Sequence, residues 1–299
     1  MQDDNTDNAY HVLITANLSS DAIIDGFTFS GGNADGTGSL VFDSESFTRD
    51  DGGGIYNYES SPTITNSTFH GNSAKGNGGG MFNLERSSPT ITNSIFSDNT
   101  AATSGGGMFN LFSCSPTITN STFVGNTAVS LGGGMVNEGS IGDASTPKLY
   151  NTVFYANTAS ESSDIFGNAI DESSSHNASD GTGGGINAGT GFVALTPEED
   201  LFTNSADPAG ADDILGTPDD GMVPSSTSPL VDAGVNSENE EETDITGGAR
   251  VMGTAIDIGA YEDQTSLSSD MPSVETTTLY PNPTSSEVYL NDHCHLYII

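Results

Sequence analysis

The chain has 299 residues, with 41 acidic and only 5 basic side chains, which gives a formal net charge of −36. This charge excludes a nucleic-acid partner held by phosphate neutralisation, because the cations that neutralise phosphates are missing, and it argues against an anionic membrane surface. We expect no transmembrane segment, since no apolar run approaches the ~18 residues that a membrane helix needs, and the first residues lack the pattern of a secretion signal.

Hydrophobic residues make up only 33% of the chain, which contains 37 glycines and no tryptophan. A low apolar content combined with a high net charge is typical of disordered proteins. The same composition also suits a fold with a thin core. The periodicity of the sequence decides between these two interpretations.

An internal repeat of about 27 residues occupies the middle of the chain. An early copy reads Ile24-Asp25-Gly26-Phe27-Thr28-Phe29, and a degenerate late copy begins at Pro147. Between them, Gly-Gly-Gly stands at 52–54, 78–80, 105–107 and 132–134, and Pro-Thr-Ile-Thr-Asn-Ser stands at 62–67, 89–94 and 116–121. Repeats of this length are typical of solenoids.

The composition of the repeat predicts β-strands, because Thr, Ser, Asn and Gly disfavour helix interiors. Each copy offers short β-prone runs, such as Gly-Gly-Met-Phe-Asn and Thr-Ile-Thr-Asn-Ser-Thr-Phe, separated by Gly and Asn at turns. We therefore expect an all-β fold over residues 1–190, a right-handed parallel β-helix with one repeat in each coil and coils stacked ~4.8 Å apart.

Columns of identical residues predict what each coil buries. One apolar and two polar columns are evident: Phe69, Phe96 and Phe123; Asn66, Asn93 and Asn120; and Asn72, Asn99 and Asn126. Buried amides that stack in this way can bond from coil to coil, which satisfies polar groups that are costly to bury. A low apolar content is therefore compatible with an ordered fold.

Threonines flank the inward-pointing Ile64, Ile91 and Ile118 and so point outward, because side chains alternate along a strand. The resulting array is a candidate binding surface made of Thr63, Thr65, Thr90, Thr92, Thr117 and Thr119. Solenoid ice-binding proteins use flat Thr arrays, which gives one minor functional hypothesis. Ordinary strand propensity also places Thr on exposed β-surfaces.

The repeat is lost after about residue 190. We expect residues 191–265 to supply an irregular final coil and a cap on the open end, since exposed solenoid edges invite aggregation, and residues 266–278 to form a linker. The cap carries an acidic run with Asp207, Asp212, Asp213, Asp219 and Asp220. Carboxylates on a Gly-containing turn suit Ca²⁺, so calcium is a possible cofactor, and a merely solvated loop is the alternative.

Three stretches of the chain resemble known families. The repeats, with their Gly-Gly-Gly-Met and Phe-x-x-Asn patterns, resemble parallel β-helix proteins of bacterial surfaces and the polymorphic outer-membrane protein repeat. Asp257-Ile258-Gly259-Ala260-Tyr261-Glu262 resembles the end region of β-helix proteins with varied C-terminal anchors. Leu279-Tyr280-Pro281-Asn282-Pro283 is similar to the start of the type IX secretion sorting domain of Bacteroidota, so residues 279–299 are predicted to be a truncated remnant of it.

These resemblances imply a non-enzymatic protein, secreted or on the outer cell surface, that is adhesin-like or structural and contacts extracellular glycans or other surface polymers. The alternative is a polysaccharide lyase or glycoside hydrolase, since some parallel β-helices are such enzymes. The available cations are Arg49, Lys75, Arg86, Lys148 and Arg250. Because Arg86 and Lys148 share no column with an acidic cluster, no catalytic residue is assigned, and we expect a monomer.

The negative charge is concentrated outside the repeats. Residues 52–160 hold 5 acids and 3 bases, whereas residues 1–51 hold 10 acids and residues 161–299 hold 26. The repeat is therefore a nearly neutral polar stack, and the acidic flanks favour solubility and resist end-to-end association.

Overall fold

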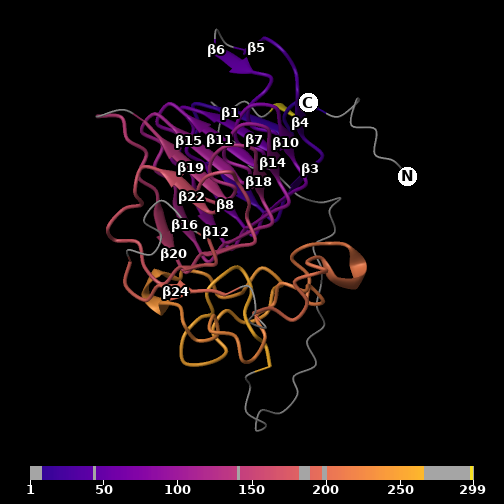
Figure 1. Cartoon of the computed structure of the whole chain (residues 1–299), viewed down its shortest axis with the longest axis vertical. Coiled ribbons are helices and arrows are strands. Elements are labelled where there is room, and N and C mark those ends of the chain that lie inside the picture. Colours follow the sequence, from indigo (N-terminus) through magenta and orange to yellow (C-terminus); the bar gives the residue numbers. More distant parts are fainter. Residues whose placement is uncertain are drawn as a thin grey trace.

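The protein is an all-β solenoid with a C-terminal segment beside it (Figure 1). The computed structural model describes residues 9–42, 45–139, 142–181, 189–196, 201–265 and 297–298. The predicted parallel β-helix is confirmed, because equivalent residues of the middle coils pair in parallel at intervals of about 27 residues. The predicted linker and most of the predicted sorting remnant lie outside the described residues.

Four sheets form the walls of the solenoid, and each of the first four coils contributes one strand to each wall. Sheet A contains β1 (Leu13–Ala16), β7 (Ile55–Tyr58), β11 (Met81–Leu84), β15 (Met108–Leu111), β19 (Met135–Glu138) and β22 (Ile165–Gly167), with β25 (Tyr297–Ile298) antiparallel to β1. Sheet B contains β2 (Ile23–Asp25), β8 (Thr63–Thr65), β12 (Thr90–Thr92), β16 (Thr117–Thr119) and β20 (Lys148–Tyr150).

Sheets C and D complete the coil. Sheet C contains β3 (Thr28–Ser30), β9 (Thr68–His70), β13 (Ile95–Ser97), β17 (Thr122–Val124), β21 (Val153–Tyr155), β23 (Ala178–Ser179) and β24 (Val193–Ala194). Sheet D contains β4 (Asn33–Ala34), β10 (Ser73–Ala74), β14 (Thr100–Ala101) and β18 (Thr127–Ala128). The first coil is longer than the others because β5 (Ser39–Phe42) and β6 (Glu45–Thr48) form an antiparallel hairpin that projects from the stack (Figure 1).

The core is a stack of identical side chains. Phe96 lies between Phe69 and Phe123, with ring centroids 4.3 and 4.4 Å apart and the rings almost parallel. All three rings are fully buried, as are Ile64, Ile91 and Ile118 of sheet B. The spacing of the rings follows from the ~4.8 Å distance between neighbouring strands, so the in-register pairing of the coils fixes the packing of the core.

A buried amide ladder runs through Asn72, Asn99 and Asn126. The Nδ2 atom of Asn99 donates to Oδ1 of Asn126 at 2.9 Å and to the carbonyl oxygen of Phe69 at 2.8 Å. Its Oδ1 atom accepts the backbone N–H of Asn72 at 3.1 Å and the side chain of Asn72 at 3.0 Å. Every hydrogen-bonding atom of the amide is therefore satisfied inside the protein.

The ladder ends on a carboxylate. Asn157 donates to Oδ1 of Asp164 at 3.0 Å, and the other oxygen of Asp164 accepts the backbone N–H of Gly181 and the hydroxyl of Ser179. An acceptor-only group suits this position because every neighbour is a donor. Burial raises the pKa of Asp164 to about 6.

The Gly-Gly-Gly triplets make a close turn between sheets D and A. In the triplet at 78–80, Gly78 has φ of 66°, and a Cβ on Gly79 would lie only 2.4 Å from the carbonyl oxygen of Thr100. A Cβ on Gly80 would lie 2.6 Å from the carbonyl oxygen of Gly107 in the next coil. The first glycine is thus required by its backbone conformation and the other two by the close approach of the coils.

Residues 201–265 lie along the side of the solenoid. Ile95, Val124 and Val153 on the outer face of sheet C pack against a second core that includes Leu230, Ile258 and Tyr261. From the sequence, residues 191–265 are predicted to supply a final coil and a cap on the open end of the stack. The described contacts place residues 201–265 along the side, because the outward side chains of Ile95, Val124 and Val153 are apolar and need a cover.

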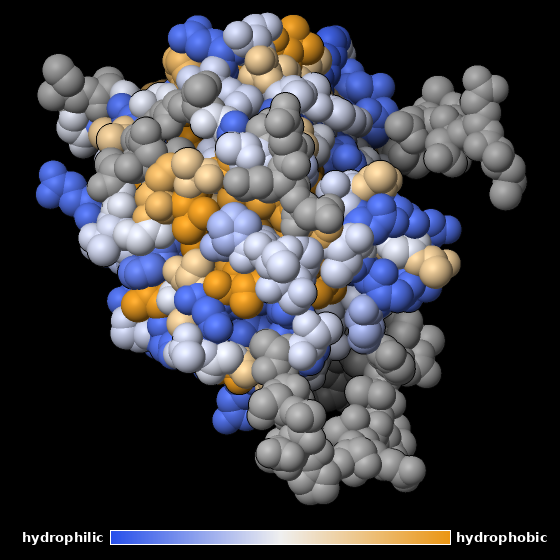
Figure 2. Space-filling model, turned by 60° about the horizontal axis from the view of Figure 1, so that its bottom comes forward, coloured by the Kyte–Doolittle hydropathy of each residue, from blue (hydrophilic) through white to orange (hydrophobic). Residues whose placement is uncertain are grey.

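The C-terminal segment contains two short 3-10 turns, η3 (Gly210–Asp212) and η4 (Asn236–Glu238), and otherwise irregular structure. On the side of the molecule shown in Figure 2, hydrophobic residues gather near the middle and hydrophilic residues surround them. No helix in the described part of the chain is long and apolar enough to cross a membrane.

We predict that Asn99→Ala destabilises the solenoid strongly. The substitution removes four buried hydrogen bonds to the neighbouring coils, and each buried polar group that is left without any partner costs roughly 1–3 kcal/mol. We expect a loss of at least ~3 kcal/mol in urea unfolding followed by circular dichroism. The exposed neighbouring change Thr100→Ala should cost less than about 0.5 kcal/mol. An equal cost for both variants would contradict the role assigned to the ladder.

Candidate functional site

The outer face of sheet B presents the predicted threonine array. Thr90 pairs with Thr63 and Thr117, and Thr92 pairs with Thr65 and Thr119, so the array forms two straight rows across three coils. Along the rows the threonines are ~4.8 Å apart, and within each strand they are ~6.7 Å apart. The array is flat and regular because the core beneath it stacks in register.

Only some hydroxyl groups of this array form hydrogen bonds within the protein. Thr63 donates to the carbonyl oxygen of Ser20 at 3.0 Å, and Thr65 donates to Oδ1 of Asp25 at 2.9 Å. In the two following coils, no side-chain hydrogen bond to the described residues is formed by Thr90, Thr92, Thr117 or Thr119. Thr90 is exposed, Thr92 and Thr117 are half-buried, and Thr119 is only 8% exposed. Thr90, Thr92 and Thr117 are therefore at least partly exposed, and their hydroxyl groups are not used by the described fold.

The two ends of the array differ in chemistry. In β2 the rows begin with Ile23, which is 60% exposed, and Asp25. In β20 they end with Lys148 and Tyr150, which pair with Thr117 and Thr119. The uninterrupted threonine surface is consequently three coils wide.

A segment that we call the strap, residues 235–243, runs along the edge of this face. Asn93 donates to the carbonyl oxygen of Thr243 at 2.7 Å, Asn120 donates to Oδ1 of Asn239 at 2.7 Å, and Asn151 donates to the carbonyl oxygen of Val235 at 3.2 Å. Three successive coils thus each contribute one amide to the strap. Thr119, the least exposed threonine of the array, directly precedes Asn120, which holds the strap.

The second asparagine column therefore has two roles. Asn66, Asn93 and Asn120 sit at the turn from sheet B to sheet C, with φ near 48°. Asn93 donates to Oδ1 of Asn66 at 3.3 Å and Asn151 donates to Oδ1 of Asn120 at 3.0 Å, as expected of a ladder. Asn120 donates to the strap instead, and Oδ1 of Asn93 has no hydrogen-bond partner in the described structure. The remaining amide hydrogens hold the strap. The sequence repeat alone carries no signal for this second role, because the strap is not part of the repeat.

Residues 257–262 fasten the C-terminal segment to the solenoid. The backbone N–H of Gly259 donates to the carbonyl oxygen of Asn151 at 2.9 Å, and that of Ala260 donates to Oγ1 of Thr122 at 3.0 Å. The hydroxyl of Tyr261 donates to Oδ2 of Asp220 at 2.5 Å. The motif singled out in the sequence is thus a structural junction.

Arg250 forms the centre of a buried charge network behind this junction. Its Nη2 atom donates to the carbonyl oxygens of Gly259 at 2.6 Å and Asp257 at 3.1 Å, and its Nη1 atom lies 3.8 Å from Oε2 of Glu262. Burial, followed by the charge of Asp257, raises the pKa of Glu262 to about 8. Burial also raises the pKa of Asp244, whose Oδ2 atom accepts the backbone N–H of Glu262 at 3.0 Å.

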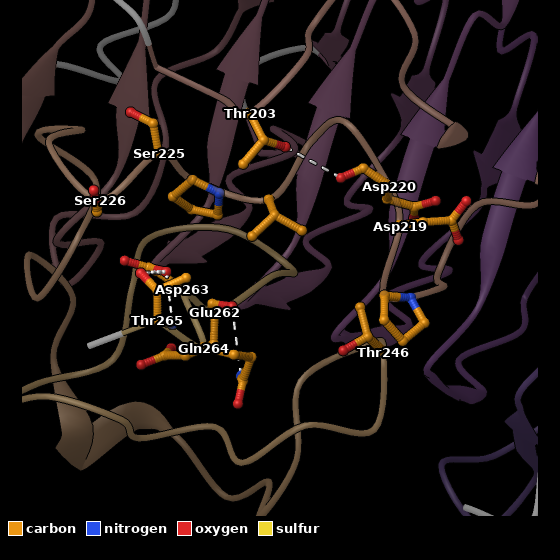
Figure 3. A pocket seen from close by; sticks show the side chains of 13 residues that line it. Thr203, Asp219, Asp220, Ser225, Ser226, Thr246, Glu262, Asp263, Gln264 and Thr265 are labelled. Carbon is orange, nitrogen blue, oxygen red and sulfur yellow. Dashed lines mark hydrogen bonds between the residues drawn. The ribbon is translucent and has the colours of Figure 1, made fainter. Parts of the chain in front are cut away.

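The C-terminal segment also contains a cavity of about 590 Å³ (Figure 3). Its wall combines apolar surface, including Pro218, Val223 and Pro224, with the polar side chains of Thr203, Asp219, Asp220, Ser225, Ser226, Thr246, Glu262, Asp263, Gln264 and Thr265. Several of these groups are already engaged: Thr203 donates to the carbonyl oxygen of Asp220 at 3.3 Å, and Thr265 donates to Oδ1 of Asp263 at 2.6 Å. The cavity is therefore shaped by internal hydrogen bonds of the segment.

The structure brings together three of the five aspartates predicted for calcium. The hydroxyl of Thr217 lies 3.4 Å from Oδ1 of Asp212, 2.9 Å from Oδ1 of Asp219 and 3.4 Å from Oδ1 of Asp220. The side chains of Asp207 and Asp213 form no hydrogen bond or ion pair with this group in the described structure. Among the residues that the structure describes, no group of three His, Cys, Asp or Glu side chains is arranged to hold a metal ion. Calcium binding stays a prediction.

The basic residues are dispersed over the molecule. Arg86 forms an exposed ion pair with Glu59 of the preceding coil. Arg49 lies over the ring of Tyr10 at 5.5 Å, and Arg250 is fully buried. Lys75 and Lys148 are exposed on sheets D and B. The lyase alternative, which needs an accessible base beside a substrate carboxylate, therefore gains no specific support from the placement of these residues.

A comparison of the chain with protein-family models, with curated proteins and with solved structures finds no match.

We predict that the C-terminal segment loses stability as the pH rises. The pKa of Glu262 lies near 4.5 when the chain is unfolded and at about 8 in the folded protein. Between these values the folded state binds more protons, so stability from this group falls as the pH rises through the window. We expect the melting temperature to fall between about pH 5 and pH 9, and to fall less in Glu262→Gln than in the exposed control Glu172→Gln. Parallel pH profiles for the two variants would contradict this assignment.

The calcium hypothesis makes a separate prediction for the loop at 207–220. An ion held by Asp212, Asp219 and Asp220 would stabilise the folded state by mass action. EDTA would then lower the melting temperature, and added Ca²⁺ would restore it in the native chain but not in Asp212→Asn/Asp219→Asn. A melting temperature that changes with neither EDTA nor Ca²⁺ would contradict calcium binding by this loop.

Proposed function

We propose that this chain is a non-enzymatic β-solenoid from a secreted or cell-surface protein of a Bacteroidota-type bacterium, and that it contacts glycans or other surface polymers through the outer face of sheet B. The observation that carries the proposal is the set of unused hydroxyl groups on Thr90, Thr92 and Thr117. They stand in register on a rigid support, and the fold does not need them.

The physical chemistry of this face suits an extended polar polymer. The hydroxyl groups can both donate and accept hydrogen bonds, as sugar hydroxyls do. Because the coils hold the threonines in fixed positions, binding does not have to order a flexible loop. Each contact is weak, but a polymer with repeated sugar units can engage several of them together, which raises the overall affinity.

An ice-binding function is a second candidate for the same face, since it too relies on a flat threonine array. The array spans only three coils before Lys148 and Tyr150 replace the threonines. Thermal hysteresis separates the two functions: a value above that of buffer supports ice binding, and a value equal to that of buffer removes it.

We predict that Thr90→Val/Thr117→Val weakens binding to the polysaccharide that the native chain retains best among insoluble cellulose, chitin and xylan. Valine keeps the shape and strand propensity of threonine and removes its hydroxyl group. Two lost hydrogen bonds of about 1 kcal/mol each correspond to a loss of affinity of roughly 10-fold or more. Depletion from solution by the polysaccharide measures this loss.

The matched control is Thr100→Val/Thr127→Val, which changes two paired threonines of adjacent coils on sheet D. We expect the control to bind like the native chain. Equal binding by both variants, or the same loss in both, would contradict the assignment of the binding face to sheet B.

A further inference from the structure

We infer that the threonine face of sheet B selects glycans that carry free amino groups, because one edge of this neutral hydroxyl surface is lined by carboxylates. The inference rests on the proposed function and names the ligand class of the same face. It depends on the position of the strap, on the charge of its side chains and on the nearly neutral character of the strands beside it.

The strap is one of the most acidic parts of the described chain. It contains Glu238, Glu240, Glu241 and Glu242 within the nine residues 235–243, and no basic residue. Glu238, Glu240 and Glu242 are exposed, and Glu241 is half-buried. Their carboxylates are therefore available to a ligand or to solvent, unlike the buried acids around Arg250.

The hydrogen bonds of the asparagine column fix these acids beside the threonines. Thr243 is held by Asn93 and Asn239 is held by Asn120, so the strap between them spans the coils of β12 and β16. Glu240 and Glu241 lie within this stretch. Figure 1 shows the C-terminal segment directly beside β12, β16 and β20.

The acids of the strap also lie close to the first strand of sheet B. Burial, followed by the negative charges of Asp25 and Glu240, raises the pKa of Glu241. Asp25 is itself exposed, and its carboxylate accepts hydrogen bonds from Thr65 at 2.9 Å and from Asn66 at 2.8 Å. The acidic edge therefore continues from the strap to the end of the threonine rows.

The strands of sheet B supply little positive charge to balance this edge. Their sequences contain a single basic residue, Lys148, at the end of one row. A polymer rich in uronate or sulfate groups would meet uncompensated negative charge, which disfavours its binding. A polymer with ammonium groups would meet carboxylates within the Debye length, which is about 10 Å at 0.1 M salt.

The two kinds of contact act on different parts of such a ligand. Sugar hydroxyls would hydrogen-bond to Thr90, Thr92 and Thr117, while protonated amines would face the carboxylates of the strap. A single exposed ammonium–carboxylate pair contributes at most about 1 kcal/mol. Repetition along the polymer adds these contributions within one binding event.

Binding of chitosan hexamers and of fully N-acetylated chitin hexamers to the full chain tests this inference by isothermal titration calorimetry. The two probes differ in whether their nitrogen atoms are charged. We expect at least about 5-fold tighter binding of the chitosan hexamer at low salt, and a loss of most of this preference at about 0.5 M NaCl.

Glu240→Gln/Glu241→Gln should reduce the preference for chitosan, whereas the charge-matched variant Asp207→Asn/Asp213→Asn should keep it. This control removes two negative charges from the same C-terminal segment, so it reports the effect of total charge alone. Melting temperatures close to that of the native chain verify that both variants fold.

The outcomes separate the inference from the proposed function. If both hexamers bind equally and Thr90→Val/Thr117→Val weakens both, the threonine face binds glycans but the inference about amino groups is overturned. If both charge variants lose the preference equally, the strap is not its source and the inference is also overturned. If neither hexamer nor any of the insoluble polysaccharides binds, the proposed function fails with it.

Discussion

The in-register stacking of successive coils is the constraint on which the rest of the structure depends. Each coil of about 27 residues places the same side chain at the same point of the wall, so a single choice of residue is repeated at every ~4.8 Å step. A phenylalanine becomes a stack of rings, and a buried asparagine becomes a ladder of amides. This arrangement lets a chain with only 33% hydrophobic residues form an ordered core, because the buried amides of Asn72, Asn99 and Asn126 bond to one another from coil to coil.

The same in-register stacking also explains which group ends the amide ladder at the last coil. A ladder in which each amide donates to the next must end on a group that only accepts, and Asp164 supplies that group for Asn157. The side chains that point outward are not constrained by the core, and their chemistry differs between sheet C and sheet B. On sheet C three of them, Ile95, Val124 and Val153, are apolar and are covered by residues 201–265, whereas the central positions on sheet B are threonines that stay open.

The features that could be predicted from the sequence are those that repeat. The strands, the stacked phenylalanines and the outward threonines all follow from columns that align without gaps. The position of residues 201–265 could not be predicted in this way, because Ile95, Val124 and Val153 occupy two different columns that contain Thr or Ser in other coils. The strap could not be predicted for a similar reason: its contacts join Asn93, Asn120 and Asn151 to a segment far away in the sequence that has no repeat of its own.

The acidic residues show most clearly why local sequence patterns do not predict which carboxylates can bind a ligand. The run at 207–220 suggests a calcium site because its aspartates are close in sequence. In the structure, however, the buried Asp220 accepts a hydrogen bond from Tyr261, while Asp207 and Asp213 are exposed. Glu262, in contrast, stands in a motif of its own, and the folded segment buries it beside Arg250 and Asp257. Burial and partners, which the fold determines, decide whether such a carboxylate is a structural group or is available to a ligand.

A crystal structure of the chain with a bound chitosan oligosaccharide is the most direct test of the central claim, that the coil stack presents a ligand-binding face on sheet B. The account predicts sugar hydroxyls within hydrogen-bonding distance of Thr90, Thr92 and Thr117 and amino groups directed toward Glu240 and Glu241. An oligosaccharide bound instead in the cavity beside Thr203 and Asp220, with the threonine face open to solvent, would contradict it.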